Sequence, residues 1–348
     1  MNRLSKRELK SFAAQMPKIE LHVHLEGAIP MDTLFGLIRS SRMDSSVRDM
    51  ADLEKKMTYR DFAHFIETWI WKNQFIHQES DFEKIGYDVL KDLHRQNVRY
   101  VEAFYSPGDF SKQGLSVKGI TSSLIRAARR ATKDFGIQSR LIIDLVRDDG
   151  PDVGMERLDE VTPFLGNGVV GIGLGGSEPE YPAGAWAGIY KEAKRRGFRL
   201  TAHAGEAAGP ESVWAALNDL NVERIGHGVR AGEDPRLISY LSEKQIPLEM
   251  CITSNLKTGV VPDLKAHPIV DYFKRDLLVT VNSDDPTLFN TSITQEYVTL
   301  IDGLDFTLDD LKKLSLNAIK ASFMETSEKE GFRSRFETEW KNCLSSYR

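Results

Sequence analysis

The chain has very little cysteine, because Cys251 and Cys343 are the only two among 348 residues. Two thiols are too few for a disulfide framework or for a zinc site built from thiolates, and their scarcity favours a reducing compartment. Cys251 lies inside an apolar, strand-like run, so we expect it to be a core residue. Any metal site in this chain must therefore use histidine and carboxylate ligands.

Long apolar runs are missing as well. Residues 1–18, MNRLSKRELKSFAAQMPK, carry several charges and lack the continuous apolar stretch of a secretory signal. No segment approaches the ~20 consecutive apolar residues that a membrane span needs. Together with the low cysteine content, these absences predict a cytoplasmic protein that does not associate with a membrane.

Positive charge is not concentrated in any part of the chain. The formal net charge is −5, and the basic clusters, Arg129-Arg130 and Lys194-Arg195-Arg196, are short and lie in helix-like segments. Such clusters are usually solvated helix faces, so we expect no nucleic-acid partner. The apolar fraction of 41% and the charged fraction of 28% are typical of a globular protein, and no feature indicates an obligatory protein partner.

Short segments rich in Val, Ile, Leu and aromatic residues recur along the chain. They cover residues 19–25, 99–105, 140–146, 169–174, 199–204, 224–227, 248–253 and 278–283. Most are continuously apolar, which is typical of strands buried on both faces. Amphipathic stretches alternate with them, at 122–136, 185–197, 212–220 and 234–245. Eight such β-then-α units predict an α/β fold of the (β/α)8 TIM-barrel type, and the span from 19 to 285 is close to the ~250 residues usual for it.

The surplus length falls mainly between the first and second strands, at residues 30–98. Two helical stretches, 62–76 and 81–96, lie there. Loops at the carboxyl end of a barrel carry function, so this helical insertion is a candidate lid or substrate wall. A helix pair that merely packs Trp69 and Trp71 is the alternative interpretation.

Two further expectations concern this insertion and the rest of the chain. The side chains that could line a substrate pocket are Phe62, His64, Phe65 and Trp69. A C-terminal helix is expected over 307–323, after the last strand. No linker or repeat divides the chain, so we expect one domain over residues 1–348.

Polar residues close four of the expected strands. They are His22 and His24 in IELHVHLEG, His203 and Glu206 in LTAHAGE, His227 in RIGHG, and Asp284 and Asp285 in VTVNSDDP. Residues two apart share one face of a strand, and two buried imidazoles are costly unless something binds them. Barrel active sites lie at the carboxyl ends of the strands, so we expect the four clusters to meet.

Three imidazoles and one carboxylate supply an N3O set of ligands, which predicts one Zn²⁺ per chain and metal-assisted hydrolysis. Taken one at a time, the same residues have plainer interpretations. A strand histidine can be a core residue, Glu206 can face a helix dipole, and Asp284-Asp285 before a proline can be a turn. Gly226 and Gly228, on either side of His227, are expected to leave room for substrate or water.

These segments also resemble a known family. PKIELHVHLEGAI, TAHAGE, RIGHG, CITSN and NSDDPTLF are similar, in order and spacing over residues 17–290, to the signature segments of the adenosine deaminase family. The resemblance implies a (β/α)8 barrel with one zinc ion. It also implies hydrolytic removal of the amino group at C6 of a purine.

The resemblance further implies a role for each matching residue. His22, His24, His203 and Asp284 would bind zinc. Glu206 would protonate the purine N1, and His227 would orient and help deprotonate the attacking water. Asp285 would accept a hydrogen bond at the N7 side, Gly176 would donate its backbone N–H to N3, and Glu26 would contact the ribose. An acid at the ring nitrogen beside an activated water is what lowers the barrier to attack at C6, and such acid–base help contributes about 10²- to 10⁴-fold.

Departures from the family pattern bear on the substrate. Glu26 stands where adenosine-specific members carry Asp, and Glu there is common in relatives that act on free adenine. Gly226, however, stands where those adenine-specific relatives show Asp. The balance favours a purine nucleoside, with adenosine first, 6-aminodeoxyfutalosine second and adenine as a further alternative.

Two alternatives of another class remain. One is a non-catalytic, nucleoside-binding relative. The other is a barrel amidohydrolase with a carbamylated lysine between two metals, although residues 174–176, at the end of the fourth strand, include no lysine.

Overall fold

The computed structural model describes residues 4–60 and 62–347. Eight strands follow one another in chain order, and each pairs in parallel with the next. They are β1 Lys18–His24, β2 Val98–Tyr105, β3 Gln138–Val146, β4 Val169–Gly175, β5 Arg199–Ala204, β6 Arg224–His227, β7 Leu248–Met250 and β8 Val279–Val281. The ring closes through Asp284, whose N–H donates to the His22 carbonyl at 3.0 Å and whose carbonyl accepts from the His24 N–H at 2.9 Å. The predicted (β/α)8 barrel is confirmed.

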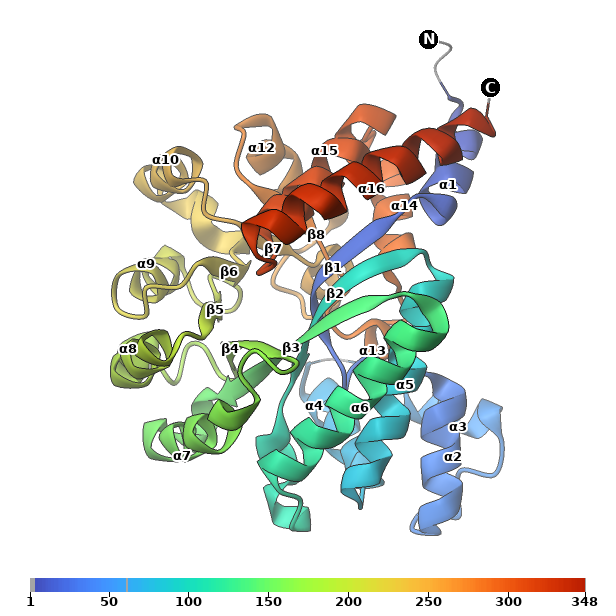
Figure 1. Ribbon diagram of the computed structural model, residues 1–348, viewed down its shortest axis with the longest axis vertical. Coiled ribbons are helices and arrows are strands. Elements are labelled where there is room, and N and C mark those ends of the chain that lie inside the picture. Colours follow the sequence, from blue (N-terminus) through green and yellow to red (C-terminus); the bar gives the residue numbers. More distant parts are fainter. Residues whose placement is uncertain (1–3, 61, 348) are drawn as a thin grey trace.

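Helices surround the strands, and Figure 1 shows α7 to α10 in a row outside β4, β5 and β6. The helices are α1 Lys6–Gln15, α2 Met31–Ser41, α3 Met50–Lys56, α4 Phe62–Asn73, α5 Glu79–Arg95, α6 Val117–Phe135, α7 Pro151–Val161, α8 Ala187–Arg196, α9 Pro210–Asn218, α10 Pro235–Lys244, α11 Ile252–Lys257, α12 Ile269–Lys274, α13 Pro286–Phe289, α14 Ile293–Leu304, α15 Leu308–Ala321 and α16 Thr326–Ser345. The insertion after the first strand carries α2 to α5, and C-terminal helices follow the last strand, as predicted. None of the helices in this described part of the chain combines the length and the apolarity needed to cross a bilayer.

Local sequence signals set the helix boundaries, as α6 illustrates. The Ser116 side chain accepts a hydrogen bond from the Gly119 N–H at 3.0 Å and caps the first turn. Gly136 ends the helix with a φ of 75°, a conformation that costs glycine little. Ile120 and Leu124, four residues apart, are buried on the inner face. The amphipathic pattern predicted at 122–136 is therefore a real helix that begins earlier, at its serine cap.

The seventh strand is shorter than predicted. We expected it over 248–253, but β7 ends at Met250 and α11 begins at Ile252. A short apolar run does not by itself distinguish a strand from a helix. Here the Thr253 N–H donates to the buried carboxylate of Glu296 at 3.0 Å, which satisfies one free donor of the first helical turn. Cys251, at the junction, is fully buried, as predicted.

The barrel interior contains a buried network of charged residues. Arg224 of β6 forms ion pairs with Glu102 of β2 and, at 2.5 Å, with Glu249 of β7. Its guanidinium also stacks on the ring of Phe323, 3.6 Å from the centroid. Glu249 in turn contacts His22 of β1. Because buried charges are tolerated only when they are paired, this network fixes the position of His22 from inside the barrel.

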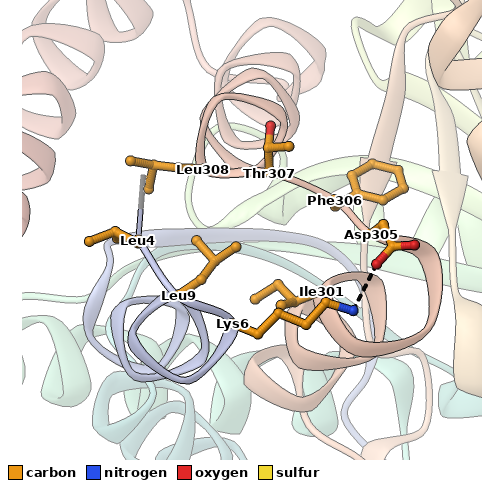
Figure 2. A pocket seen from close by; sticks show the side chains of 8 residues that line it. All are labelled: Leu4, Lys6, Leu9, Ile301, Asp305, Phe306, Thr307 and Leu308. Atoms are coloured by element: carbon orange, nitrogen blue, oxygen red, sulfur yellow. Dashed lines mark hydrogen bonds and ion pairs between the residues drawn. The ribbon is translucent and has the colours of Figure 1, made fainter. Parts of the chain in front are cut away.

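A surface pocket lies between α1 and the turn that joins α14 to α15 (Figure 2). The Lys6 ammonium forms an ion pair with Asp305 at 2.7 Å across it, and Leu9 and Phe306 supply apolar walls. Its lining includes none of the residues that end the strands. This pocket is therefore separate from the polar clusters described next.

Candidate metal centre

The four predicted ligands come from three places at the carboxyl edge of the barrel. His22 and His24 end β1, His203 lies near the end of β5, and Asp284 follows β8. Asp284 adopts a φ of 63°, which is uncommon for a residue other than glycine and is found at constrained functional positions. Parallel strands bring these ends together, so residues more than 180 positions apart face one another.

The ligand atoms of these side chains share one small region. The Nε2 atom of His203 lies 3.0 Å from that of His22 and 3.3 Å from that of His24. Asp284 Oδ1 lies 3.5 Å from His22 Nε2 and 3.3 Å from His24 Nε2. Zinc–nitrogen bonds of 2.0–2.1 Å in a tetrahedron place neighbouring ligand atoms about 3.3 Å apart. The spacing therefore fits a single ion of that size.

The electrostatics of the cluster also favour a cation. Burial disfavours a charged His22, but the carboxylates of Asp284 and Glu249 outweigh burial and raise the pKa of His22 to about 10. Burial lowers the pKa of His24 to about 4 and holds the pKa of His203 well below its usual range. Two imidazoles are thus neutral at pH 7, and the two carboxylates favour positive charge at His22. A divalent ion would satisfy both demands.

Outer contacts orient two of the imidazoles. Glu249 Oε2 lies 2.7 Å from His22 Nδ1, and the Leu174 carbonyl oxygen lies 3.2 Å from His203 Nδ1. Such partners fix the tautomer and aim Nε2 at the shared region. Glu249 was not among the residues predicted from the sequence. Its only signal was a lone acid in the otherwise apolar start of the seventh strand, LEMC.

Four buried residues form an alternative metal cluster that includes Cys251. It combines Cys251 with His22, His227 and Asp284. A thiol must lose its proton to bind a metal, but burial raises the pKa of Cys251 well above its usual range. Its Sγ also donates to the Glu249 carbonyl oxygen at 3.5 Å. The set with three histidines and Asp284 is therefore the better candidate.

Glu206 and His227 lie beside the candidate ligands. His227 Nε2 is 3.5 Å from Glu206 Oε2 and 3.8 Å from Asp284 Oδ2. Burial, together with the charges of Asp284 and Glu178, raises the pKa of Glu206 to about 8, whereas burial lowers the pKa of His227 to about 3. At neutral pH this pair therefore consists of a protonated carboxyl and a neutral imidazole.

Asn255 holds the ring of His227. Its Nδ2 donates to His227 Nδ1 at 3.1 Å, and its Oδ1 lies 3.2 Å from His267 Nε2. A neutral imidazole that accepts at Nδ1 carries its proton on Nε2, the atom that faces Glu206. No catalytic or binding role was predicted for Asn255 or His267, although Asn255 ends the CITSN segment.

Glu178 fixes the turn that carries Glu206. One carboxylate oxygen accepts from the N–H of Gly205 at 2.5 Å. The other accepts from the N–H groups of Glu206, Ala207 and Ala208 at 3.1, 2.7 and 2.9 Å. This buried carboxylate therefore satisfies four successive backbone donors. The sequence alone gave no reason to connect it with residues near position 206.

The predicted substrate-binding residues lie at the same edge of the barrel. Glu26 and Asp285 are buried, and each has one carboxylate oxygen with no hydrogen-bond partner among the described residues. Glu26 uses its other oxygen to accept from the Ser106 N–H at 2.9 Å. Gly176 follows β4 with a φ of 88°, and a Cβ atom there would lie 2.3 Å from Asp148 Oδ2. A larger residue at position 176 would therefore be both strained and crowded.

The expectation for the glycines beside His227 was wrong. A Cβ atom at Gly226 would lie 2.9 Å from His22 Cε1 and 3.2 Å from His203 Cα. The space beside Gly228 is filled by Leu248, 2.8 Å from such an atom. These glycines leave room for a candidate ligand and for core packing, not for substrate or water.

The helix α4 lies over the edge of the barrel that carries this cluster. Phe65 stacks on Phe289 of α13, with ring centroids 5.2 Å apart, and Trp69 Nε1 donates to Asp109 Oδ2 at 2.9 Å. Phe289 follows β8 and Asp109 follows β2, so α4 connects the loops on both sides of β1. The expected side chain of Phe62 lies outside the described residues.

The chain matches known proteins over nearly its whole length. A family model described as adenosine deaminase matches residues 17–339. The chain is 35% identical to the aminodeoxyfutalosine deaminase of Streptomyces avermitilis, covering 95% of this chain and 93% of that protein. It is 34% identical to an adenosine deaminase of Clostridium botulinum and 32% identical to the adenine deaminase of Wolinella succinogenes, each match covering 92% of this chain and 97% of the relative.

Solved structures give the same result. The adenine deaminase of Arthrobacter aurescens superposes with a TM-score of 0.88 at 28% identity, covering 95% of this chain and 99% of that one. A zinc-bound amidohydrolase from Burkholderia ambifaria has a TM-score of 0.89 at 26% identity, covering 99% and 96%. The N6-methyl-AMP deaminase of Arabidopsis thaliana has a TM-score of 0.84 at 26% identity, covering 94% and 98%.

Proposed function

Since the chain belongs to the adenosine deaminase family and is an aminohydrolase, we propose that it removes the C6 amino group of a 6-aminopurine nucleoside by hydrolysis, with adenosine as the foremost substrate. The observation that carries the proposal is the convergence of three imidazole Nε2 atoms and one carboxylate oxygen beside Glu206, whose pKa burial raises to about 8. This arrangement combines a site for a metal ion with a proton donor. The proposed products are inosine and ammonia.

His22, His24, His203 and Asp284 would hold one zinc ion, which supplies a water of lowered pKa, near 7, for attack. The zinc-bound relative from Burkholderia ambifaria supports this choice of metal. The reaction then needs a proton at the purine ring. Glu206, protonated at neutral pH, is the donor to N1, and protonation there makes C6 electrophilic.

His227 orients the attacking water in this scheme. Because Asn255 donates to Nδ1, the proton of a neutral His227 lies on Nε2, where it can donate to an oxygen. This contact supports the orienting role that the family resemblance implies, and it does not favour removal of a proton by His227.

Asp285 would contact N7, but as a donor. The purine N7 is itself an acceptor, so only a protonated carboxyl can bond to it. Burial and the neighbouring Asp284 raise the pKa of Asp285 well above its usual range, which supports the protonated form. Gly176 remains the proposed N–H donor to N3, and Glu26 the proposed contact to the sugar.

A direct test measures metal content and turnover on the same preparation. We expect about one zinc ion per chain and conversion of adenosine to inosine, followed by the change in purine absorbance. Glu206→Gln should retain the zinc and lose nearly all activity. A protein with full zinc that deaminates no 6-aminopurine would overturn the proposal and would favour a non-catalytic, nucleoside-binding role.

The substrate is tested by comparing kcat/KM on adenosine, adenine and 6-aminodeoxyfutalosine. The identity of 35% to an aminodeoxyfutalosine deaminase makes that nucleoside the second candidate. A tenfold lead for one substrate corresponds to about 1.4 kcal/mol of transition-state stabilisation, so one specific contact is measurable. A lead for adenine would contradict the nucleoside assignment.

A further inference from the structure

The helix α4 carries a buried lysine that the proposed reaction does not use. Lys72 is 1% exposed, and its ammonium donates to Asn73 Oδ1 at 2.6 Å. The same Nζ lies 4.1 Å from the centroid of the Trp69 ring, whose Nε1 is tied to Asp109. No carboxylate of the described residues lies within 4.0 Å of it, although an ammonium has three donors to satisfy. A buried cation without a direct counter-ion is costly and needs a function or a ligand.

The groups around Lys72 have unmet hydrogen-bonding capacity too. Burial lowers the pKa of Lys72 to about 8, and the nearby carboxyl groups of Glu26, Asp285 and Asp109 oppose this shift. Glu26 Oε2 and Asp285 Oδ1 are buried without a partner among the described residues, as is the hydroxyl of Tyr59. Lys72 thus interacts electrostatically with Glu26 and Asp285, but among the described residues no hydrogen bond joins its ammonium to either carboxyl group.

We propose that Lys72 is a specificity residue that, together with Glu26, binds the hydroxyl groups of the substrate's sugar. A hydroxyl can accept a hydrogen bond from the Lys72 ammonium and donate one to the Glu26 carboxylate. A sugar can therefore satisfy the hydrogen-bonding capacity of both side chains. A free purine base has no such group to offer. This inference rests on the proposed function, because it assumes that the purine lies beside Glu206.

The test measures product binding to the zinc-loaded, full-length protein by calorimetry, so it does not depend on turnover. Inosine carries the sugar, and 9-methylhypoxanthine replaces it with a methyl group. With unaltered protein, inosine should bind at least tenfold more tightly than 9-methylhypoxanthine. Equal affinity for the two ligands would overturn the proposal without any substitution.

Substitutions test whether Lys72 causes the preference for inosine over 9-methylhypoxanthine. Lys72→Met should weaken inosine at least tenfold and leave 9-methylhypoxanthine within twofold, and Lys72→Gln, which keeps a donor, should recover part of the loss. Lys55→Met, which removes a side chain that is 79% exposed on α3, is the matched control and should change neither affinity. If Lys72→Met weakens both ligands equally or neither, Lys72 is structural and the inference fails. Absence of turnover with this binding pattern intact would instead reject the proposed function alone.

Discussion

Replacing Glu178 with Gln tests how the turn after β5 holds Glu206. In the native chain one carboxylate oxygen serves Gly205, and the other serves Glu206, Ala207 and Ala208. Gln keeps the shape but turns one oxygen into an NH2 group, which cannot accept. If the side-chain oxygen of this Gln accepts from Glu206, Ala207 and Ala208, these three hydrogen bonds remain but their acceptor is no longer charged. The NH2 group of the Gln then faces the Gly205 N–H, which loses its acceptor.

The structure gives a magnitude for this change. Hydrogen bonds to a charged group contribute roughly 1.5–3 kcal/mol and neutral ones roughly 0.5–1.5 kcal/mol. One lost bond of about 2 kcal/mol and three bonds weakened by about 1 kcal/mol each amount to roughly 5 kcal/mol, an upper bound because neighbouring bonds are not additive. If about half of this free energy serves to place Glu206 in the transition state, kcat/KM falls roughly a hundredfold.

The assay separates positioning from general damage. We expect the loss in kcat rather than in KM, zinc content near that of the native protein, and a lower pH for the loss of activity, since the Glu178 charge raises the pKa of Glu206. Glu180→Gln, at an exposed position two residues away, is the control and should be silent. Native kcat in Glu178→Gln, or a loss of zinc in parallel with activity, would refute this reasoning.

Three other perturbations probe the same centre. Glu249→Gln removes the charge that faces His22 Nδ1 and leaves Arg224 paired with Glu102 alone. The zinc dissociation constant, measured by competition with a chelator, should therefore rise about 10- to 100-fold. An unchanged constant would argue against an orienting role for Glu249. Gly226→Ala places a methyl group 2.9 Å from His22 Cε1, so zinc affinity should fall. Thermal unfolding should show that the free energy of unfolding decreases by about 1–3 kcal/mol. No change in either quantity would mean that the His22 ring moves aside freely. Finally, Glu206 must be protonated to donate, and burial raises its pKa to about 8. A nearby divalent cation lowers this pKa, so kcat/KM should decrease as pH rises through a value at or below about 8. A rate that still rises at pH 9 would exclude Glu206 as the acid.

The sequence was sufficient for the barrel and for the four motifs that meet at its rim. Apolar runs mark buried strands, and the rule that barrel sites lie at the carboxyl ends brings His22, His203 and Asp284 together without coordinates. The residues that orient these groups could not be found in the same way. Glu249 and His22 are 227 positions apart and meet only across the closed barrel. In the sequence, Glu178 is an ordinary acidic residue of a loop. Its contacts with the turn after β5 form only in the folded chain.

The misread glycine has the same physical origin. Gly226 was judged by its neighbours in the chain, which suggested free space beside His227. Its real neighbour is His22, on a strand that is not adjacent to β6 in the sheet. Contacts across a barrel interior depend on strand tilt and stagger, which local sequence patterns do not encode.

Closure of the barrel and assembly of the metal centre depend on the same residue. The peptide group of Asp284 joins β1 to the segment after β8, donating to the His22 carbonyl and accepting from the His24 N–H, while its side chain supplies the candidate carboxylate ligand. A shift of one residue in this pairing would turn the histidine side chains to the other face of β1 and separate the ligands. An ion held by these four side chains would therefore link the first strand, the fifth strand and the end of the eighth. Because the linkage exists only when the register is correct, binding of a metal ion would select the closed, correctly paired barrel, and its free energy would add to the stability of the seam.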